Sequence, residues 1–207
     1  MVIFLYIHCF KRGIDIILSL LGIVILGIPM LIIALVIKVE DSGPVMFKQK
    51  RIGKNKQSFN LLKFRSMKID TPHDIPTHKL INPENYLLKC GKLLRQYSLD
   101  ELPQLFNIIK GDMSLIGPRP ALWNQYDLIK ERDKYGANDI LPGLTGWAQI
   151  NGRDELEIAI KAKLDGEYVE KQSFRFDCIC FFRTIVKVLC HDGVVEGAAS
   201  NNQKEES

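Results

Sequence analysis

Two acidic residues stand side by side in the stretch SLDELPQL, where Asp100 and Glu101 are flanked by leucines. Paired carboxylates are a common way to build a reaction centre that transfers protons or groups. The same letters also fit a capped helix start, because Ser98 and the acid three residues later match a capping box. Asp100 would then lie in the first turn, where the helix dipole favours negative charge. The local sequence leaves both interpretations open.

An apolar run of 22 residues without a formal charge extends from Ile16 to Ile37. As a helix it would be roughly 33 Å long, which is enough to cross the hydrocarbon core of a bilayer. Pro29 lies near its middle, so the segment either spans as a kinked helix or breaks and returns to the face it entered. Basic residues flank both ends, and the positive-inside tendency disfavours placing one of these flanks outside. The sequence therefore favours a re-entrant, monotopic membrane helix broken at Pro29.

Basic residues are concentrated between positions 48 and 68, where eight lysines and arginines occur without an acid in a chain of net charge +4. Next to a membrane segment, such a cluster suits anionic headgroups or a substrate that bears phosphate. A solvated basic loop is the alternative, and no recognition motif accompanies the charge to favour nucleic acid. The five cysteines are odd in number and form no C-x-x-C pair, which favours a reducing compartment.

The remaining pattern predicts an α+β fold, mainly α, with one small β-hairpin. Period-two alternation favours strands within 43–53 and 58–67, joined by the basic turn GKNK. The stretches SLIGPRPAL and LPGLTGWAQINGR are predicted to be extended chain and a glycine-rich loop. Helical spacing is found over five segments: residues 83–96, 102–109, 121–135, 154–171 and 174–189.

We divide the chain into three parts on this basis. Residues 1–40 form the membrane-anchoring helix, residues 41–195 form a single folded domain, and residues 196–207 form a polar tail that we expect to be disordered.

Five blocks, taken in order, resemble the bacterial sugar transferase family, the small monotopic polyprenyl-phosphate phosphoglycosyl transferases. The blocks are KRGIDIILSLLGIVILGIPM, SGPVMFKQKRIG, LLKFRSMK, LLRQYSLDELPQLFNIIKGDMSLIGPRP and LPGLTGWAQINGR. The likeness extends from about Lys11 to Val195, and its last three blocks are highly specific. One departure is the helix break, which is commonly Ser-Pro in the family and is Ile28-Pro29 here.

The resemblance implies that residues 41–195 are a catalytic domain that moves a sugar-1-phosphate from a UDP-sugar to polyprenyl (undecaprenyl) phosphate and releases UMP. Asp100 would be the nucleophile that takes the phosphosugar covalently and a ligand of Mg²⁺, and Glu101 would be the general base. This is the first membrane step in building exopolysaccharide, capsule, lipopolysaccharide or another surface glycoconjugate. The expected location is the bacterial inner membrane, with the active site on the cytoplasmic face.

The resemblance also implies four phosphate-binding groups around the dyad. Arg95 would clamp a phosphate with two hydrogen bonds. Lys63 and Arg65 match a basic pair of the family and would contact the diphosphate. Arg119, whose backbone is stiffened by a proline on each side, is expected near the nucleotide. The alternative for each of these residues is a surface ion pair.

The remaining matched residues lie further along the chain or at its start. The loop over 142–153 would shape the uridine pocket, with Gln149 and Arg153 as its polar groups. Asp165 matches a family acid and is expected to pair with an arginine. Lys11 and Arg12 would meet lipid phosphates at the membrane surface.

Two other functions remain open at this point. A membrane-anchored glycosyltransferase would use the same donor and metal but release UDP, and a membrane-tethered adaptor would have no activity. Among donors, the small size of the chain and the lack of an N-terminal extension favour an N-acetylated hexosamine derivative. The expected partners are the UDP-sugar, polyprenyl phosphate and membrane lipids, without nucleic acid.

Overall fold

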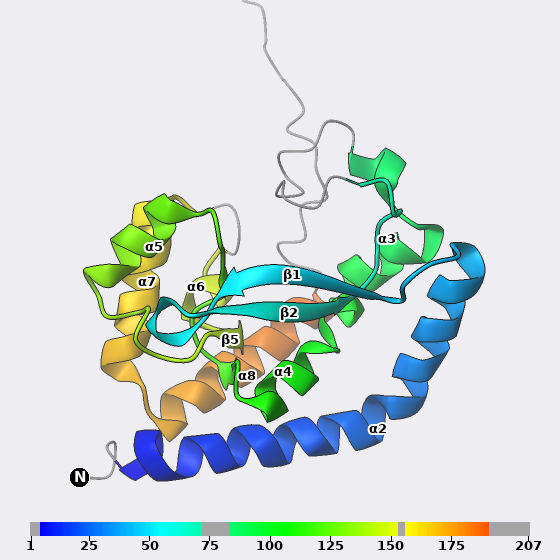
Figure 1. Ribbon diagram of the computed structural model, residues 1–207. Helices are drawn as coiled ribbons and strands as arrows, with labels where there is room; N and C mark the ends of the chain where they lie inside the picture. The colour runs from blue at the N-terminus through cyan, green and yellow to red at the C-terminus, as the bar shows by residue number, and fades with distance from the viewer. Residues whose placement is uncertain (1–4, 72–82, 153–155, 191–207) are drawn as a thin grey trace, which may run out of the picture.

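One long helix dominates the N-terminal part of the computed structural model, which describes residues 5–71, 83–152 and 156–190. A π-helical turn, η1 (Tyr6–Phe10), leads into α2 (Lys11–Glu40). The 30 residues of α2 run below the rest of the molecule and then turn upward along its side (Figure 1). Within the described residues, α2 is the one helix that is long and apolar enough to cross a membrane by length and composition.

Pro29 lies inside α2 and the helix continues through it, so the predicted break is not confirmed. Helix α2 as a whole is bent (Figure 1). A proline ring removes one helical hydrogen bond and crowds the preceding turn, which is the usual cause of such a bend. The outward residues of α2 are strongly exposed, reaching 78% at Val24, 75% at Ile28 and 86% at Val39. The helix therefore presents a long apolar face that the described part of the chain does not cover.

The predicted hairpin is present, and a third strand extends it. Strands β1 (Met46–Ile52) and β2 (Ser58–Phe64) pair antiparallel, with Met46 opposite Phe64 and Ile52 opposite Ser58. Strand β4 (Ala121–Leu122) joins the free edge of β1. A second, parallel pair links β3 (Ser114–Ile116) to β5 (Gly143–Thr145), so the segment predicted as a glycine-rich loop contributes a strand.

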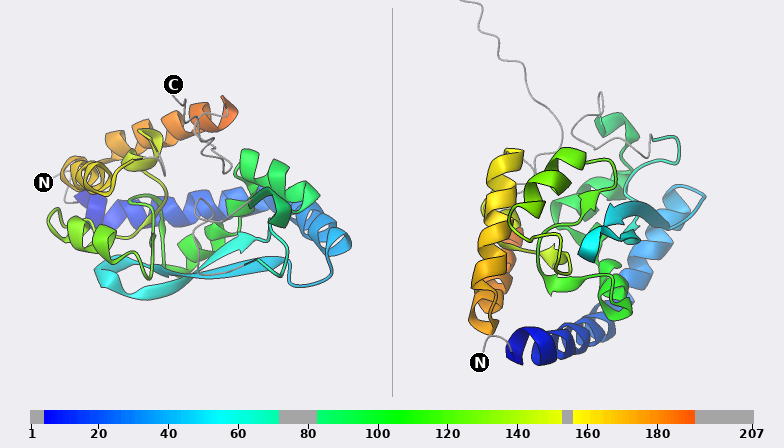
Figure 2. Two further views of the ribbon diagram at one scale, coloured as in Figure 1. Left: turned by 90° about the horizontal axis from the view of Figure 1, so that it is seen from above. Right: turned by 60° about the vertical axis from the view of Figure 1, so that its left-hand side comes forward.

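The helices follow the predicted order with shifted boundaries. The segment predicted over 83–96 is divided into the 3₁₀ turn η4 (Pro83–Tyr86) and α3 (Lys89–Gln96), and the helix predicted from residue 121 begins later because Ala121 and Leu122 join the sheet. The remaining helices are α4 (Gln104–Lys110), α5 (Tyr126–Asp133), α6 (Trp147–Ile150), α7 (Ile158–Lys171) and α8 (Phe174–Leu189). The β1–β2 hairpin and α8 lie on opposite sides of the molecule (Figure 2).

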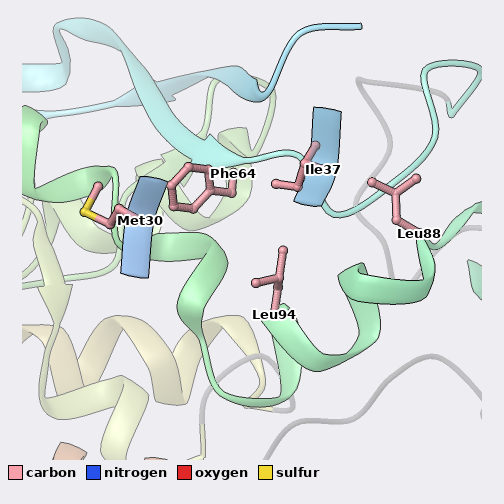
Figure 3. Packing of buried hydrophobic residues seen from close by; sticks show 5 residues of the cluster. All are labelled: Met30, Ile37, Phe64, Leu88 and Leu94. Atoms are coloured by element: carbon pink, nitrogen blue, oxygen red, sulfur yellow. The ribbon is translucent and has the colours of Figure 1, made fainter. Parts of the chain in front are cut away.

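Two apolar clusters fix the elements that surround the acidic pair. The first joins α2, β2 and α3 through Met30, Ile37, Phe64, Leu88 and Leu94 (Figure 3). The second joins β2 to α4 and the following turn through Leu61, Leu105, Ile108 and Met113. Burying side chains of this size stabilises a fold by about 1.5–3 kcal/mol each. The clusters therefore hold β2, α3 and α4 against α2, and the acidic pair lies in the short connection between α3 and α4.

Candidate active site

The acidic pair lies on a 3₁₀ turn, η5 (Leu99–Glu101), between α3 and α4. The predicted capping box is wrong, because Ser98 makes no side-chain cap and α4 begins only at Gln104, after Pro103. Ser98 adopts the left-handed conformation, with φ of 55°. A non-glycine residue in this conformation costs about 1–3 kcal/mol and is frequent at functional sites. The positions of Asp100 and Glu101 are therefore set by this 3₁₀ turn and not by the first turn of a helix.

Two cationic side chains from other parts of the chain lie close to the two acids. The Nζ atom of Lys63, on β2, lies 2.7 Å from Glu101 Oε1 and 3.8 Å from Asp100 Oδ2. The Nη2 atom of Arg119, from the segment between β3 and β4, lies 3.1 Å from the same Glu101 oxygen. The structure therefore brings together four residues that the sequence analysis assigned to one site.

The two carboxyl groups have different electrostatic environments. Burial raises the pKa of Asp100 above its ordinary value, and the negative charge of Glu101 raises it further, against the opposing effect of Lys63. Burial also acts to raise the pKa of Glu101, but the charges and hydrogen bonds of Lys63 and Arg119 outweigh it and hold that pKa far below its ordinary value. Glu101 is therefore the ionised member, and Asp100 is a buried acid whose negative charge needs further compensation.

A divalent cation such as Mg²⁺ could neutralise this undercompensated negative charge. Asp100 offers hard carboxylate oxygens, which suit this ion. Among residues 5–71, 83–152 and 156–190, no group of three or more histidines, cysteines or acids is clustered in a way that could hold a metal by itself. Mg²⁺ commonly binds through one or two carboxylates together with substrate phosphates, and the site fits that arrangement.

Arg95 and Arg65 were both predicted to bind phosphate, and the structure places them differently. Arg95 lies in the last turn of α3, close enough for its charge to lower the pKa of Asp100. Arg65 lies beyond the end of β2, where its guanidinium pairs with the Asp41 carboxylate and donates to the Asp41 carbonyl at 2.6 Å. The strand ends at Phe64, so the alternation that would align Arg65 with Lys63 no longer applies.

Asp165 and Gln149, which lie further from the dyad in sequence, both contact protein groups. Asp165 pairs with an arginine, as predicted, but that arginine is Arg132 of α5, at 2.6 Å in the α5–α7 interface. Gln149, on α6, donates to the Leu144 carbonyl at 3.0 Å, while its own amide oxygen is buried without a hydrogen bond. Arg153 lies outside the described residues.

Lys11 and Arg12 contact protein groups where lipid phosphates were predicted. Lys11 forms a buried ion pair with Asp177 of α8 at 2.5 Å. Arg12 donates to the carbonyls of Ile108 and Ile109 at 2.7 and 3.0 Å, and so caps the C-terminal end of α4. Unpaired carbonyls at a helix end attract cations, which explains the placement of Arg12.

Two positioning contacts were not anticipated. Arg51, on β1, donates to the Pro120 carbonyl at 3.0 Å and thereby fixes the segment that carries Arg119. Asn107, on α4, accepts from the Leu62 N–H and donates to the Asn60 carbonyl, both at 2.9 Å, and so ties α4 to β2 beside Lys63. The sequence showed only that Arg51 belongs to the basic stretch between positions 48 and 68. Nothing in the sequence indicated a positioning role for Asn107.

Glycines bring the Arg119 segment against the β5 segment. A Cβ added at Gly146 would lie 2.0 Å from the Gly117 carbonyl oxygen, and one at Gly143 would lie 2.1 Å from the Gly117 nitrogen. Side chains at these positions would force the two backbones apart. The glycines of the predicted uridine loop are therefore used for backbone packing that holds the proline-flanked arginine in place.

Comparison with known proteins places this arrangement in a family. A family model described as bacterial sugar transferase matches residues 6–191. The chain is 42% identical over 159 residues to the uncharacterized sugar transferase EpsL of Bacillus subtilis, covering 77% of each chain. The chain belongs to the bacterial sugar transferase family, and it is an enzyme of the sugar-phosphate transferase type.

Two further relatives have names that specify a donor sugar. An Aeromonas hydrophila protein named UDP-N-acetylgalactosamine-undecaprenyl-phosphate N-acetylgalactosaminephosphotransferase is 38% identical over 186 residues, which is 86% of this chain and 43% of that protein. An Escherichia coli protein named UDP-glucose:undecaprenyl-phosphate glucose-1-phosphate transferase is also 38% identical, over 86% of this chain and 39% of its own length. Both relatives are therefore much longer than the region that they share with this chain.

Proposed function

We propose that this protein transfers a sugar-1-phosphate from a UDP-sugar to undecaprenyl phosphate, releases UMP, and does so through a phosphosugar-aspartate intermediate. The observation that carries the proposal is the pair of a buried Asp100 and a half-buried Glu101, with Lys63 and Arg119 within 3.1 Å of Glu101. The reactions named for the relatives are consistent with it. This activity would begin the assembly of a surface glycan at the membrane.

In the first step, an Asp100 oxygen attacks the sugar-bearing phosphorus of the donor. The bond from that phosphorus to the bridging oxygen breaks, and the oxygen leaves with UMP. In the second step, a phosphate oxygen of undecaprenyl phosphate attacks the same phosphorus and releases the Asp100 carboxylate. Dividing one displacement into two is the general advantage of nucleophilic catalysis.

Glu101 is suited to accept the proton of the incoming acceptor phosphate. In the structure it is bonded to Lys63 and Arg119, which keep it ionised. Donor phosphates attract the same two cations, and their approach would weaken these bonds. The pKa of Glu101 would then rise toward the range where a carboxylate is an effective base.

Asp100, together with donor phosphate oxygens, would hold Mg²⁺. When bound, the ion would supply positive charge to the diphosphate, which otherwise repels a carboxylate nucleophile. Lys63 and Arg119 supply part of the same compensation from fixed positions, and Arg95 lies near enough to add a third charge.

We further propose that α2 lies in the inner membrane as a monotopic element, with the dyad on the cytoplasmic face. Near its start, Arg12 bonds to α4, and at its end Glu40 accepts from the Cys90 N–H of α3 at 3.0 Å. Both ends are thus fixed to one domain, whereas a helix that crossed the bilayer would leave its ends on opposite sides. The exposed apolar face between these ends supplies the surface that lipid would cover.

The donor sugar is proposed at the level of its class. An N-acetylated hexosamine derivative is the first donor to test, and UDP-glucose is the matched comparison, because relatives of equal identity are named for each kind.

Identification of the released nucleotide tests the proposal. Purified protein in lipid nanodiscs is given a UDP-sugar, Mg²⁺ and undecaprenyl phosphate, with the Asp100→Asn variant as control. We expect UMP in equal amount to the lipid-linked sugar phosphate, and neither product from the variant. Release of UDP would replace the proposal with a glycosyltransferase. Absence of any nucleotide product across donors of both classes would indicate an adaptor.

A further inference from the structure

The last residue of the membrane helix caps a helix of the catalytic domain. One carboxylate oxygen of Glu40 accepts from the Lys89 N–H, and the other accepts from the Cys90 N–H at 3.0 Å. These are the first two residues of α3, and Leu88, which precedes them, provides no side-chain cap of its own. The free N–H groups of α3 are therefore satisfied by a residue about 50 positions earlier in the chain.

Helix α3 leads directly into the dyad. Its last turn carries Arg95, whose charge acts on Asp100, and only Tyr97 and Ser98 separate the helix from η5. The start of α3 is also closely packed, since a Cβ at Gly91 would lie 2.0 Å from the Ser66 carbonyl oxygen. Because α3 is a single helix of eight residues, a displacement at its N-terminal end would carry over to its far end.

The other side of the dyad is held by the opposite end of the same membrane helix. Arg12 caps the last turn of α4, the helix that follows the dyad. Between the two ends, a Cβ at Gly22 would contact Leu105 of α4 at 3.2 Å, while Met30 and Ile37 pack in the cluster that holds Leu94 of α3 (Figure 3). Helix α2 thus spans the connection that carries the two acids and contacts the helices on both sides of it.

We infer that Glu40 is a positioning residue for the dyad, which holds α3, Arg95 and the Asp100–Glu101 turn in register from the end of the membrane helix. The inference rests on the proposed function of the dyad. It assigns α2 a second role besides anchoring, because the geometry of the reacting carboxylates depends on a contact made by its final residue.

The test compares Glu40→Ala and Glu40→Gln with Glu170→Ala, a control at an exposed glutamate of α7. Hydrogen exchange is followed in peptides that cover residues 97–103 and in peptides of α7. We expect exchange over 97–103 to accelerate about tenfold in Glu40→Ala. Glu40→Gln retains one acceptor oxygen and should give a smaller acceleration. The control should match the wild type throughout.

Steady-state kinetics give the second readout. We expect kcat to fall about tenfold in Glu40→Ala, with KM for the donor within about twofold of wild type. Glu40→Gln should recover part of the loss in kcat, again without a change in KM, which a global loss of structure would not produce.

Each outcome decides the inference. Unchanged exchange over 97–103 in Glu40→Ala, or an unchanged kcat, would overturn it. Equal acceleration in the α7 peptides would also overturn it, because the effect would then be global loosening. If the wild type transfers no sugar phosphate, the proposed function fails, and the exchange comparison still decides whether Glu40 holds the dyad turn.

Discussion

The cluster around Asp177 and the Asp100–Glu101 dyad both combine acids with cations, and they have different properties. At Asp177, one carboxylate accepts from Lys11 at 2.5 Å and from the hydroxyls of Tyr6 and Tyr168 at 2.6 and 2.7 Å. At the dyad, two adjacent carboxylates share Lys63 and Arg119, and Asp100 has a raised pKa.

The difference separates a structural ion pair from the proposed reaction centre. The Lys11 and Asp177 side chains are 10% and 8% exposed, and Asp177 accepts hydrogen bonds from three donors. At the dyad, Arg119 remains 31% exposed, and its positive charge is accessible to a ligand. A buried acid that is fully satisfied holds elements together, whereas an undercompensated acid beside accessible cations is suited to bind and react with phosphate.

The largest expected effect is the loss of activity in Asp100→Asn. Without the nucleophile, transfer should fall by about 10³-fold or more. The fold should be equally stable or more stable, because the buried negative charge, which the raised pKa of Asp100 shows to be disfavoured, is gone. Product formation and thermal unfolding measure the two quantities. Wild-type activity in this variant would remove Asp100 from the mechanism.

Asp177→Asn should show the reverse pattern. Removing one partner of a buried ion pair typically costs about 3–5 kcal/mol, so the free energy of unfolding should fall by that amount. The folded fraction should keep its kcat within about twofold, because Asp177 lies on α8 outside the dyad cluster. Denaturant unfolding in detergent and activity per folded molecule test this. A loss of activity without a loss of stability would refute the distinction drawn between the two clusters.

Lys63→Gln should shift the pH dependence. The charge of Lys63 lowers the pKa of both Asp100 and Glu101, so without it both values rise. The acid limb of the pH–rate profile should move to higher pH by about one unit, and Lys63→Arg should restore most of its position. An acid limb that stays in place in Lys63→Gln would show that the dyad acids do not set it.

The smallest effect is expected from Lys56→Gln at the tip of the same hairpin. Lys56 pairs with Asp133 at 3.0 Å, but the two side chains are 51% and 44% exposed. Exposed pairs contribute about 0–1 kcal/mol, so stability should fall by less than that and activity should not change. Comparing the activities of Lys56→Gln and Lys63→Gln distinguishes the effect of removing any basic charge from the hairpin from the effect of removing a charge at the dyad. A clear drop in activity would extend the site to the hairpin tip.

Much of the fold was predictable because its signals are local. The alternation around the GKNK turn gave the β1–β2 hairpin, and the helix predicted over 174–189 has the bounds of α8. The parallel pairing of β3 with β5 was not predictable, since it depends on backbone contact between Gly117 and Gly143, which are far apart in sequence. The predicted capping box is absent because Ser98 is left-handed and α4 begins only after Pro103. Ser98 therefore does not lie at the start of that helix.

The candidate site was predictable at its centre and less so around it. The resemblance selected the dyad, Lys63 and Arg119, which the fold brings together. It could not show that Arg65 pairs with Asp41, or that Arg12 caps α4, because these contacts depend on where the ends of α2 meet the domain. The role of Glu40 was not predictable either, because its partners lie about 50 residues away in the sequence.

Intact-mass analysis tests the central claim most directly. Purified protein is mixed with UDP-sugars and Mg²⁺ in the absence of undecaprenyl phosphate. The account predicts a mass gain equal to one phosphosugar in the wild type and none in Asp100→Asn, and the size of the gain would identify the donor. No adduct with any donor, together with UMP release only after undecaprenyl phosphate is added, would contradict the covalent intermediate and indicate direct transfer.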